Sequence, residues 1–244
     1  MLLAFLLFCV AILYSAVGHA GASGYMAAMA LLGMAPEEMR PTALALNLVV
    51  GGIGLYRFWR AGHVRARNVL PFVLASAPAA FLAAHAGLTR QLYDVLLGLV
   101  LVAAAVGVFR SAHVAASEDQ MAAQRAVPWI PALLAGAAIG VLSGLTGTGG
   151  AIFLTPLLLL AHWMPTRDAS GTSVAFVWVN SLTALAGLVH ATGTLPTALP
   201  LWVGAVVLGA LIGTQLGIGW LPARALRRAL GVVLLVAAAK LLAW

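Results

Sequence analysis

The chain has 244 residues, of which 63% are hydrophobic and only 8% are charged, whereas about 25% of the residues in soluble chains are charged. So few charged residues cannot cover the surface of a water-soluble domain. The sequence therefore excludes a water-soluble protein. The formal net charge of +7 does not indicate nucleic-acid binding, because the arginines cluster beside apolar segments, as topology signals do.

The apolar runs recur along the whole chain and are long enough for membrane helices. They lack the alternation of barrel strands, so we expect an all-α fold. The expected segments are Leu2–Val17, Gly21–Met34, Thr42–Trp59, Val69–Gly87, Tyr93–Phe109, Trp129–Leu145, Gly150–Trp163, Gly171–His190, Ala198–Leu216 and Ala225–Leu242. Residues 1–110 then form a first transmembrane repeat, residues 111–127 a polar cytoplasmic linker, and residues 128–244 a second repeat.

The two halves resemble each other at matched positions, which indicates an internal duplication. The offset between matched residues stays between 129 and 133. The pairs are Gly18 with Gly147, Gly21 with Gly150, Pro36 with Pro165, Thr42 with Thr172, Asn47 with Asn180, Gly62 with Gly193, Pro71 with Pro200, Gly87 with Gly217, and Gly98 with Gly231.

The arginines predict that the second repeat is inverted. The loop between the third and fourth segments is rich in arginine in the first half, whereas its counterpart, residues 191–197, has no charge. The next loop reverses this bias, with Arg224, Arg227 and Arg228 in the second half. Because arginine-rich loops stay on the cytoplasmic side, equivalent loops face opposite sides of the membrane.

The expected architecture is therefore an all-α integral membrane protein with two inverted repeats. Each repeat has a glycine-broken helical hairpin followed by three transmembrane helices. Both termini are expected on the non-cytoplasmic side. Whether the hairpin arms span the bilayer or are re-entrant stays open.

The two hairpin tips are the candidate binding site. Their residues are Gly18, His19 and Gly21 in the first half, and Gly147, Thr148, Gly149 and Gly150 in the second. Glycines break a helix and leave N–H groups unpaired at the next helix start, which favours an anion. Broken helices at matching positions hold the substrate in many transporters with inverted repeats. The alternative is that these glycines only allow close helix packing.

Polar residues inside the apolar segments extend this candidate site. Asn47 and Asn180 could donate to a bound anion from both repeats, and Thr172 and Ser173 lie nearby in the sequence. Singly, each could also be a hydrogen bond between helices. His19 could carry a proton or donate to an anion, or have a structural role.

The sequence does not favour a metal site or a cofactor. No Asp or Glu lies in the middle of a segment, and no His, Cys, Asp and Glu cluster has metal-ligand spacing. We therefore expect no cofactor and no metal.

With these features, the sequence resembles the sulfite exporter TauE/SafE family of membrane permeases over essentially the whole chain. The resemblance lies in the two repeats, the polar linker, the glycine break Gly147–Gly150 and the run Arg167–Ser173. The first repeat departs from the pattern at Gly18–Gly21 and at Pro41–Thr42. The resemblance implies a permease that moves sulfite, sulfonates or related small anions across the bacterial inner membrane by alternating access. Its expected partners are a small anionic substrate and membrane lipid, not nucleic acid, and a homodimer stays open.

Two alternatives come from other classes. The run Gly21–Gly24 also matches the GxSG motif of rhomboid intramembrane proteases, with Ser23 as nucleophile. The order of the other rhomboid elements is wrong, because the element Trp59–Arg60 follows the serine. A permease for another small solute, including a metal ion, is the second alternative.

Overall fold

The computed structural model describes residues 1–16, 20–86, 88–114, 127–161, 163–192, 199–219 and 223–242. Every regular element in these ranges is an α-helix, which confirms the all-α expectation. The helices are α1 (Leu2–Ala16), α2 (Ala22–Leu31), α3 (Pro36–Arg60), α4 (Ala66–Ala84), α5 (Arg90–Val114), α6 (Trp129–Thr146), α7 (Ala151–Leu160), α8 (Thr166–Thr192), α9 (Leu199–Gly219) and α10 (Ala223–Leu242). Helix α5 runs into the first residues of the expected linker, most of which lies outside the described ranges.

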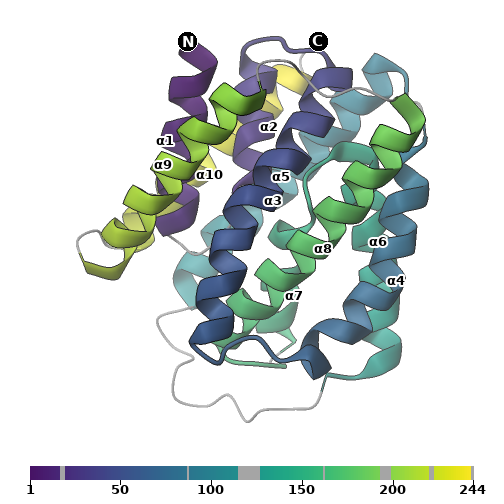
Figure 1. Cartoon of the computed structure of the whole chain (residues 1–244), viewed down its shortest axis with the longest axis vertical. Coiled ribbons are helices and arrows are strands. Elements are labelled where there is room, and N and C mark those ends of the chain that lie inside the picture. The colour runs from purple at the N-terminus through teal and green to yellow at the C-terminus, as the bar shows by residue number, and fades with distance from the viewer. Residues whose placement is uncertain are drawn as a thin grey trace.

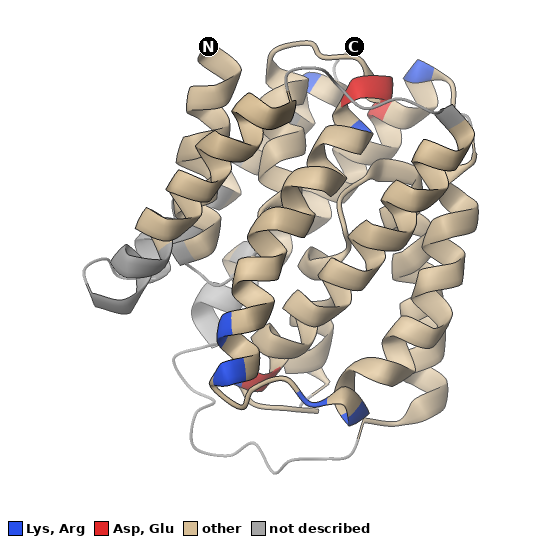
Figure 2. Ribbon diagram, in the orientation of Figure 1, with Lys and Arg blue, Asp and Glu red and all other residues tan. Residues whose placement is uncertain are grey.

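The bundle exposes large apolar side chains on its outer faces, while most of its buried residues are apolar and a smaller number are polar. Five described helices are long and apolar enough to cross a membrane, namely α3, α4, α6 and most of α5 and α8. Large apolar side chains such as Leu82 on α4 and Ile130 and Leu134 on α6 are exposed. Charged residues gather toward the two ends of the bundle (Figure 2). The chain is therefore a multi-pass membrane protein whose outer faces contact lipid.

Helices α3 and α8 begin earlier than the sequence predicts. The expected starts were Thr42 and Gly171, whereas the helices start at Pro36 and Thr166. Proline is tolerated in the first turn of a helix, and acidic residues there interact favourably with the helix dipole. The acidic residues before the expected segments, Glu37, Glu38 and Asp168, thus lie in the first turns of these helices.

Helices α2 and α7 are half-length. Each has 10 residues, which corresponds to about 15 Å, about half of the hydrocarbon core. Their partner arms α1 and α6 have 15 and 18 residues. Each hairpin therefore combines a long arm with a short arm that begins inside the bundle.

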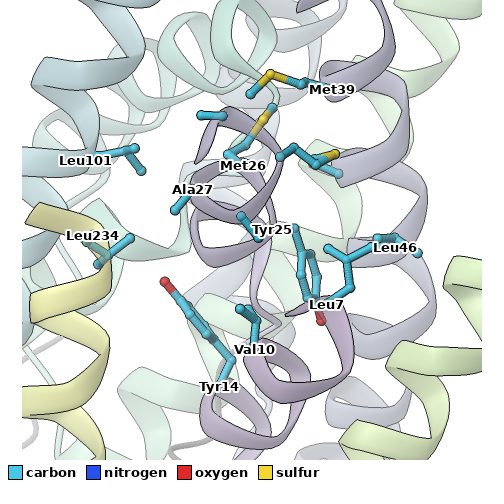
Figure 3. Packing of buried hydrophobic residues seen from close by; sticks show 14 of the residues in the cluster. Leu7, Val10, Tyr14, Tyr25, Met26, Ala27, Met39, Leu46, Leu101 and Leu234 are labelled. Carbon is cyan, nitrogen blue, oxygen red and sulfur yellow. The ribbon is translucent and has the colours of Figure 1, made fainter. Parts of the chain in front are cut away.

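The other helices pack against one another in five main pairs. Helix α1 packs on α9, α4 on α6 and on α8, α5 on α10, and α3 on α8. Figure 1 shows α3 and α8 side by side, and α7 packs against α8. Around α2, the largest apolar cluster joins residues of α1, α3, α5 and α10, including Leu7, Met39, Leu101 and Leu234 (Figure 3).

Glycines bring α6 and α4 into direct backbone contact. A Cβ added at Gly136, Gly140 or Gly144 would overlap the carbonyl oxygens of Phe72, Ser76 and Ala80, respectively. The spacing of four residues on both helices is the small-residue pattern by which membrane helices approach closely. These glycines are thus packing residues, unlike those at the hairpin tips.

We predict that Gly140→Ala destabilises the protein. The new methyl would meet the Ser76 carbonyl oxygen at 2.5 Å, and overpacking of this kind costs about 1–3 kcal/mol. The melting temperature in detergent measures the effect. Gly204→Ala is the matched control, because nothing lies within 4 Å of its added Cβ. Equal melting temperatures for the two variants would contradict the close contact.

Candidate functional site

Both half-helices begin at a glycine in the left-handed conformation. Gly21 precedes α2 with φ 103°, and Gly150 precedes α7 with φ 86°. Glycine adopts this conformation at little cost, whereas other residues are strained in it. Because the residue before each helix is glycine, it has no side chain that could cap the helix start. The first N–H groups of each half-helix therefore lie inside the bundle as donors with partial positive charge.

The second break lies between α3 and α8. A Cβ on Gly147 would lie 3.0 Å from Arg40 Cα. A Cβ on Gly149 would collide with Asn47 Nδ2, and one on Gly150 would lie 3.6 Å from Asn180 Nδ2. The structure thus brings four predicted residues together, one from α3, one from α8 and two from the glycine run.

The two asparagines are buried with unpaired polar atoms. Asn47 is 1% exposed and donates from Nδ2 to Ser181 Oγ at 3.2 Å, while its Oδ1 has no partner among the described residues. Asn180 is 0% exposed, and neither atom of its amide has a partner there. A buried unpaired polar group costs about 1–3 kcal/mol, so its presence calls for an explanation. A ligand bound beside Gly149 and Gly150 would provide the missing partner.

The other predicted residues of the second half have different surroundings. Thr148 is buried and shares a hydrogen bond with the Thr146 hydroxyl at 2.9 Å, so its side chain turns toward the end of α6. Ser173 accepts a hydrogen bond from Thr155 of α7 at 2.8 Å. Thr172 is buried with an unpaired hydroxyl. Both α8 residues lie about two turns before Asn180, which is about 10 Å along the helix axis.

The first break is described only at its end, because Gly18 and His19 lie outside the described residues. The described end approaches the same crossing of α3 and α8. A Cβ on Gly51 of α3 would lie 3.5 Å from Ala20 Cβ and 3.9 Å from Trp178 Cδ1 of α8. Gly51 lies one turn after Asn47, so both breaks border one region of the bundle.

Arg40 is a buried residue beside the site that the sequence did not indicate. It is 8% exposed, and its Nη2 donates to the carbonyl oxygens of Ala84 at 2.9 Å and Gly144 at 2.8 Å. These carbonyls belong to the last turns of α4 and α6, where backbone acceptors lack helical partners. Arg40 therefore ties the start of α3 to both helix ends and fixes the position of Gly147. In the sequence, its charge beside Glu37, Glu38 and Pro41 is more typical of a loop between apolar segments.

Ser181 is a second residue that the sequence did not indicate. Its hydroxyl accepts the Asn47 hydrogen bond and lies 3.1 Å from the Cβ position of Gly149. Its place next to Asn180 was the available signal, but the partner on α3 depends on how the two helices cross.

Comparison with known proteins gives a consistent result. The family model described as "Sulfite exporter TauE/SafE" matches residues 3–241. A curated protein of Sinorhizobium fredii (strain NBRC 101917 / NGR234), named "Probable membrane transporter protein y4hK", is 42% identical over 240 residues, which cover 98% of this chain and 97% of that protein. No solved structure matches the chain.

We predict that Arg40→Gln destabilises the fold by about 1–3 kcal/mol, because it removes the donor shared by two buried carbonyls. Arg40→Lys is expected to recover part of this loss, since one ammonium cannot reproduce the planar geometry of the guanidinium. Thermal unfolding in detergent measures both variants. Arg90→Gln is the control, since Arg90 is 64% exposed in a long ion pair of 3.7 Å, and such pairs contribute little. If Arg40→Gln unfolded at the same temperature as the native protein, the structural role of Arg40 would be refuted.

Proposed function

The chain belongs to the sulfite exporter TauE/SafE family, and we propose that it is a secondary transporter for small sulfur-containing anions such as sulfite or an organosulfonate. It would move them across the bacterial inner membrane by alternating access. The observation that carries this proposal is the buried Asn180 amide, unpaired in the described chain and directed at the start of α7.

The chemistry of the interior favours an anion. Two helix starts and two amides offer hydrogen-bond donors, which suit oxyanions. The one buried carboxylate among the described residues, Asp168, is paired with His63 at 2.8 Å. The described residues also hold no group of three His, Cys, Asp or Glu side chains that could bind a metal ion. This environment gives little support to a cation or metal transporter.

The inverted repeat gains support from how the helices pair. Under the proposed equivalence of α1 with α6 and of α4 with α9, the contact of α1 with α9 corresponds to the contact of α6 with α4. Helices α5 and α10 also contact reciprocally. A Cβ on Gly98 would meet Leu242 near the end of α10, and one on Gly231 would meet Phe109 in the second half of α5. A two-fold axis in the membrane plane would generate both relations.

Alternating access would act at the crossing of α3 and α8, one helix from each proposed repeat. These helices meet through Asn47 and Ser181 beside the second break. At one end of the bundle, the loop after α3 is tied to α8 by the 2.8 Å hydrogen bond between His63 and Asp168. Opening that end to release the anion would require this pair to separate while the crossing keeps its position.

A protease function is less well supported. The Ser23 hydroxyl forms a 2.6 Å hydrogen bond with the Tyr14 hydroxyl, whereas a serine nucleophile needs a base such as histidine. The family and the curated relative are described as an exporter and a probable transporter, which points away from an enzyme.

We predict that sulfite, thiosulfate, sulfate, taurine or sulfoacetate raises the melting temperature of the purified protein, since a ligand that binds the native state stabilises it. The shift should be lost in Asn180→Ala and reduced in Asn47→Ala, because these amides would donate to the anion. Chloride tests whether charge alone suffices. Thr183→Ala is a control on α8, since its hydroxyl bonds only its own helix.

The outcomes separate the parts of the proposal. A sulfur oxyanion that stabilises the native protein and Thr183→Ala, but not Asn180→Ala, would support the site and its substrate class. An equal shift in Asn180→Ala would refute this site. No shift with any anion, in a protein that unfolds cooperatively, would refute the anion function.

The orientation gives a separate prediction. Both termini lie at one end of the bundle. The arginine-rich connection between α3 and α4 lies at the opposite end (Figures 1 and 2). By the positive-inside rule, that connection is cytoplasmic. Alkaline phosphatase fused after Trp244 should therefore be active in the periplasm, while a fusion in the 111–127 linker should be inactive. The reverse pattern would overturn the proposed topology.

A further inference from the structure

An unpaired phenol lies at the start of α2. Tyr25 is 0% exposed, and its hydroxyl has no hydrogen-bond partner in the part of the chain that the structure describes. The three atoms nearest to a Cβ built on Gly21 all belong to Tyr25, with the hydroxyl oxygen at 2.8 Å. The Tyr25 side chain therefore folds back over the glycine that precedes its own half-helix.

The Tyr25 ring packs among apolar side chains. The Tyr25 ring lies beside Leu7 and Leu46 in the core cluster (Figure 3). A hydroxyl buried among such residues loses its hydrogen bonds to water and destabilises the protein unless something replaces them. The N–H groups at the start of α2 cannot satisfy its donor, because they are donors themselves. What is missing is an acceptor, and a helix start favours one that is negatively charged.

The other described buried tyrosines show that this lack is specific to Tyr25. The Tyr14 hydroxyl pairs with Ser23 at 2.6 Å, and the Tyr93 hydroxyl donates to the Thr146 carbonyl oxygen at 3.1 Å. The offset between Gly21 and Gly150 places Leu154 at the position of Tyr25 in the second half, and Leu154 is also fully buried. A half-helix can therefore pack without a hydroxyl at this position.

The start of α2 is also close to the second break. Ala20 precedes Gly21 and lies against Gly51 of α3, which in turn approaches Trp178 of α8. Asn47, which borders Gly149, lies one helical turn before Gly51 on the same face of α3. The residue before the start of α2 and the second break thus border the same crossing of α3 and α8.

We propose that the Tyr25 hydroxyl is a ligand-binding donor that determines the affinity for an oxyanion at this crossing. The anion accepts one hydrogen bond from Tyr25 at the start of α2 and others from Asn47 and Asn180 at the start of α7. The two halves then recognise the anion by different groups, a phenol in the first and amides in the second. This inference rests on the proposed anion function and adds a residue of the first half to its site.

Tyr25→Phe in the full-length protein tests this proposal, because it removes the hydroxyl and keeps the ring. Without ligand, its melting temperature should equal or exceed that of the native protein, since an unpaired buried hydroxyl is lost. Sulfite affinity, measured by titration of the thermal shift and by calorimetry, should fall at least about tenfold, as expected for a hydrogen bond to a charged group. Stability and affinity thus change in different directions, which a purely structural role would not produce.

Tyr14→Phe is the matched control, because its hydroxyl is already paired. It should lower the melting temperature without ligand and leave sulfite affinity unchanged. Tyr25→Leu, which copies the second half, should lose affinity as Tyr25→Phe does. Native-like affinity in Tyr25→Phe would overturn the inference and leave the anion function standing. A lower melting temperature of ligand-free Tyr25→Phe would also overturn it. If the native protein binds none of the tested anions, both proposals fail.

Discussion

The structure depends on two helix starts that are buried inside the bundle. In a membrane interior, each free N–H group must find an acceptor within the protein or in a ligand. Helices α2 and α7 start inside the bundle after Gly21 and Gly150, which have no side chain to cap them. Their long arms α1 and α6 hold them at this depth, and α3 and α8 pass beside them. The rest of the fold can be understood as the support for these two starts.

That support requires helices to approach more closely than ordinary side chains allow. Glycines on α6 contact the backbone of α4, and Gly209 and Gly213 on α9 contact the carbonyl oxygens of Phe8 and Ile12 on α1 in the same manner. Each long hairpin arm is thus packed against a helix that the proposed duplication assigns to the other repeat. The hairpins are held by tight backbone contacts, while the interior beside the half-helices retains unpaired polar groups. Close packing of the long helices keeps the bundle rigid, and unpaired polar groups beside the half-helices remain available to bind a ligand.

The two halves are not equivalent at this centre. The second break has Asn180, Asn47 with Ser181, and the Arg40 backbone around its glycines. The described end of the first break has Tyr25 over Gly21. In the proposed inverted repeat, this difference would give the bound anion a fixed orientation. The duplication would then supply the two helix starts, and later divergence would supply the groups that distinguish one anion from another.

The amino-acid sequence by itself determined the all-α membrane fold, the segments that become helices and the positions of the glycine breaks. These properties are local, since hydrophobicity, segment length and the effect of glycine on a helix depend on neighbouring residues. Asn47 and Asn180 were found in the same way, as amides in apolar runs. The tertiary structure alone decided which helices meet. It placed Arg40 inside the bundle, paired Asn47 with Ser181 and turned Tyr25 over Gly21. A sequence pattern shows that a residue is buried, but the partner it meets depends on how two distant helices cross, and no local pattern contains that crossing.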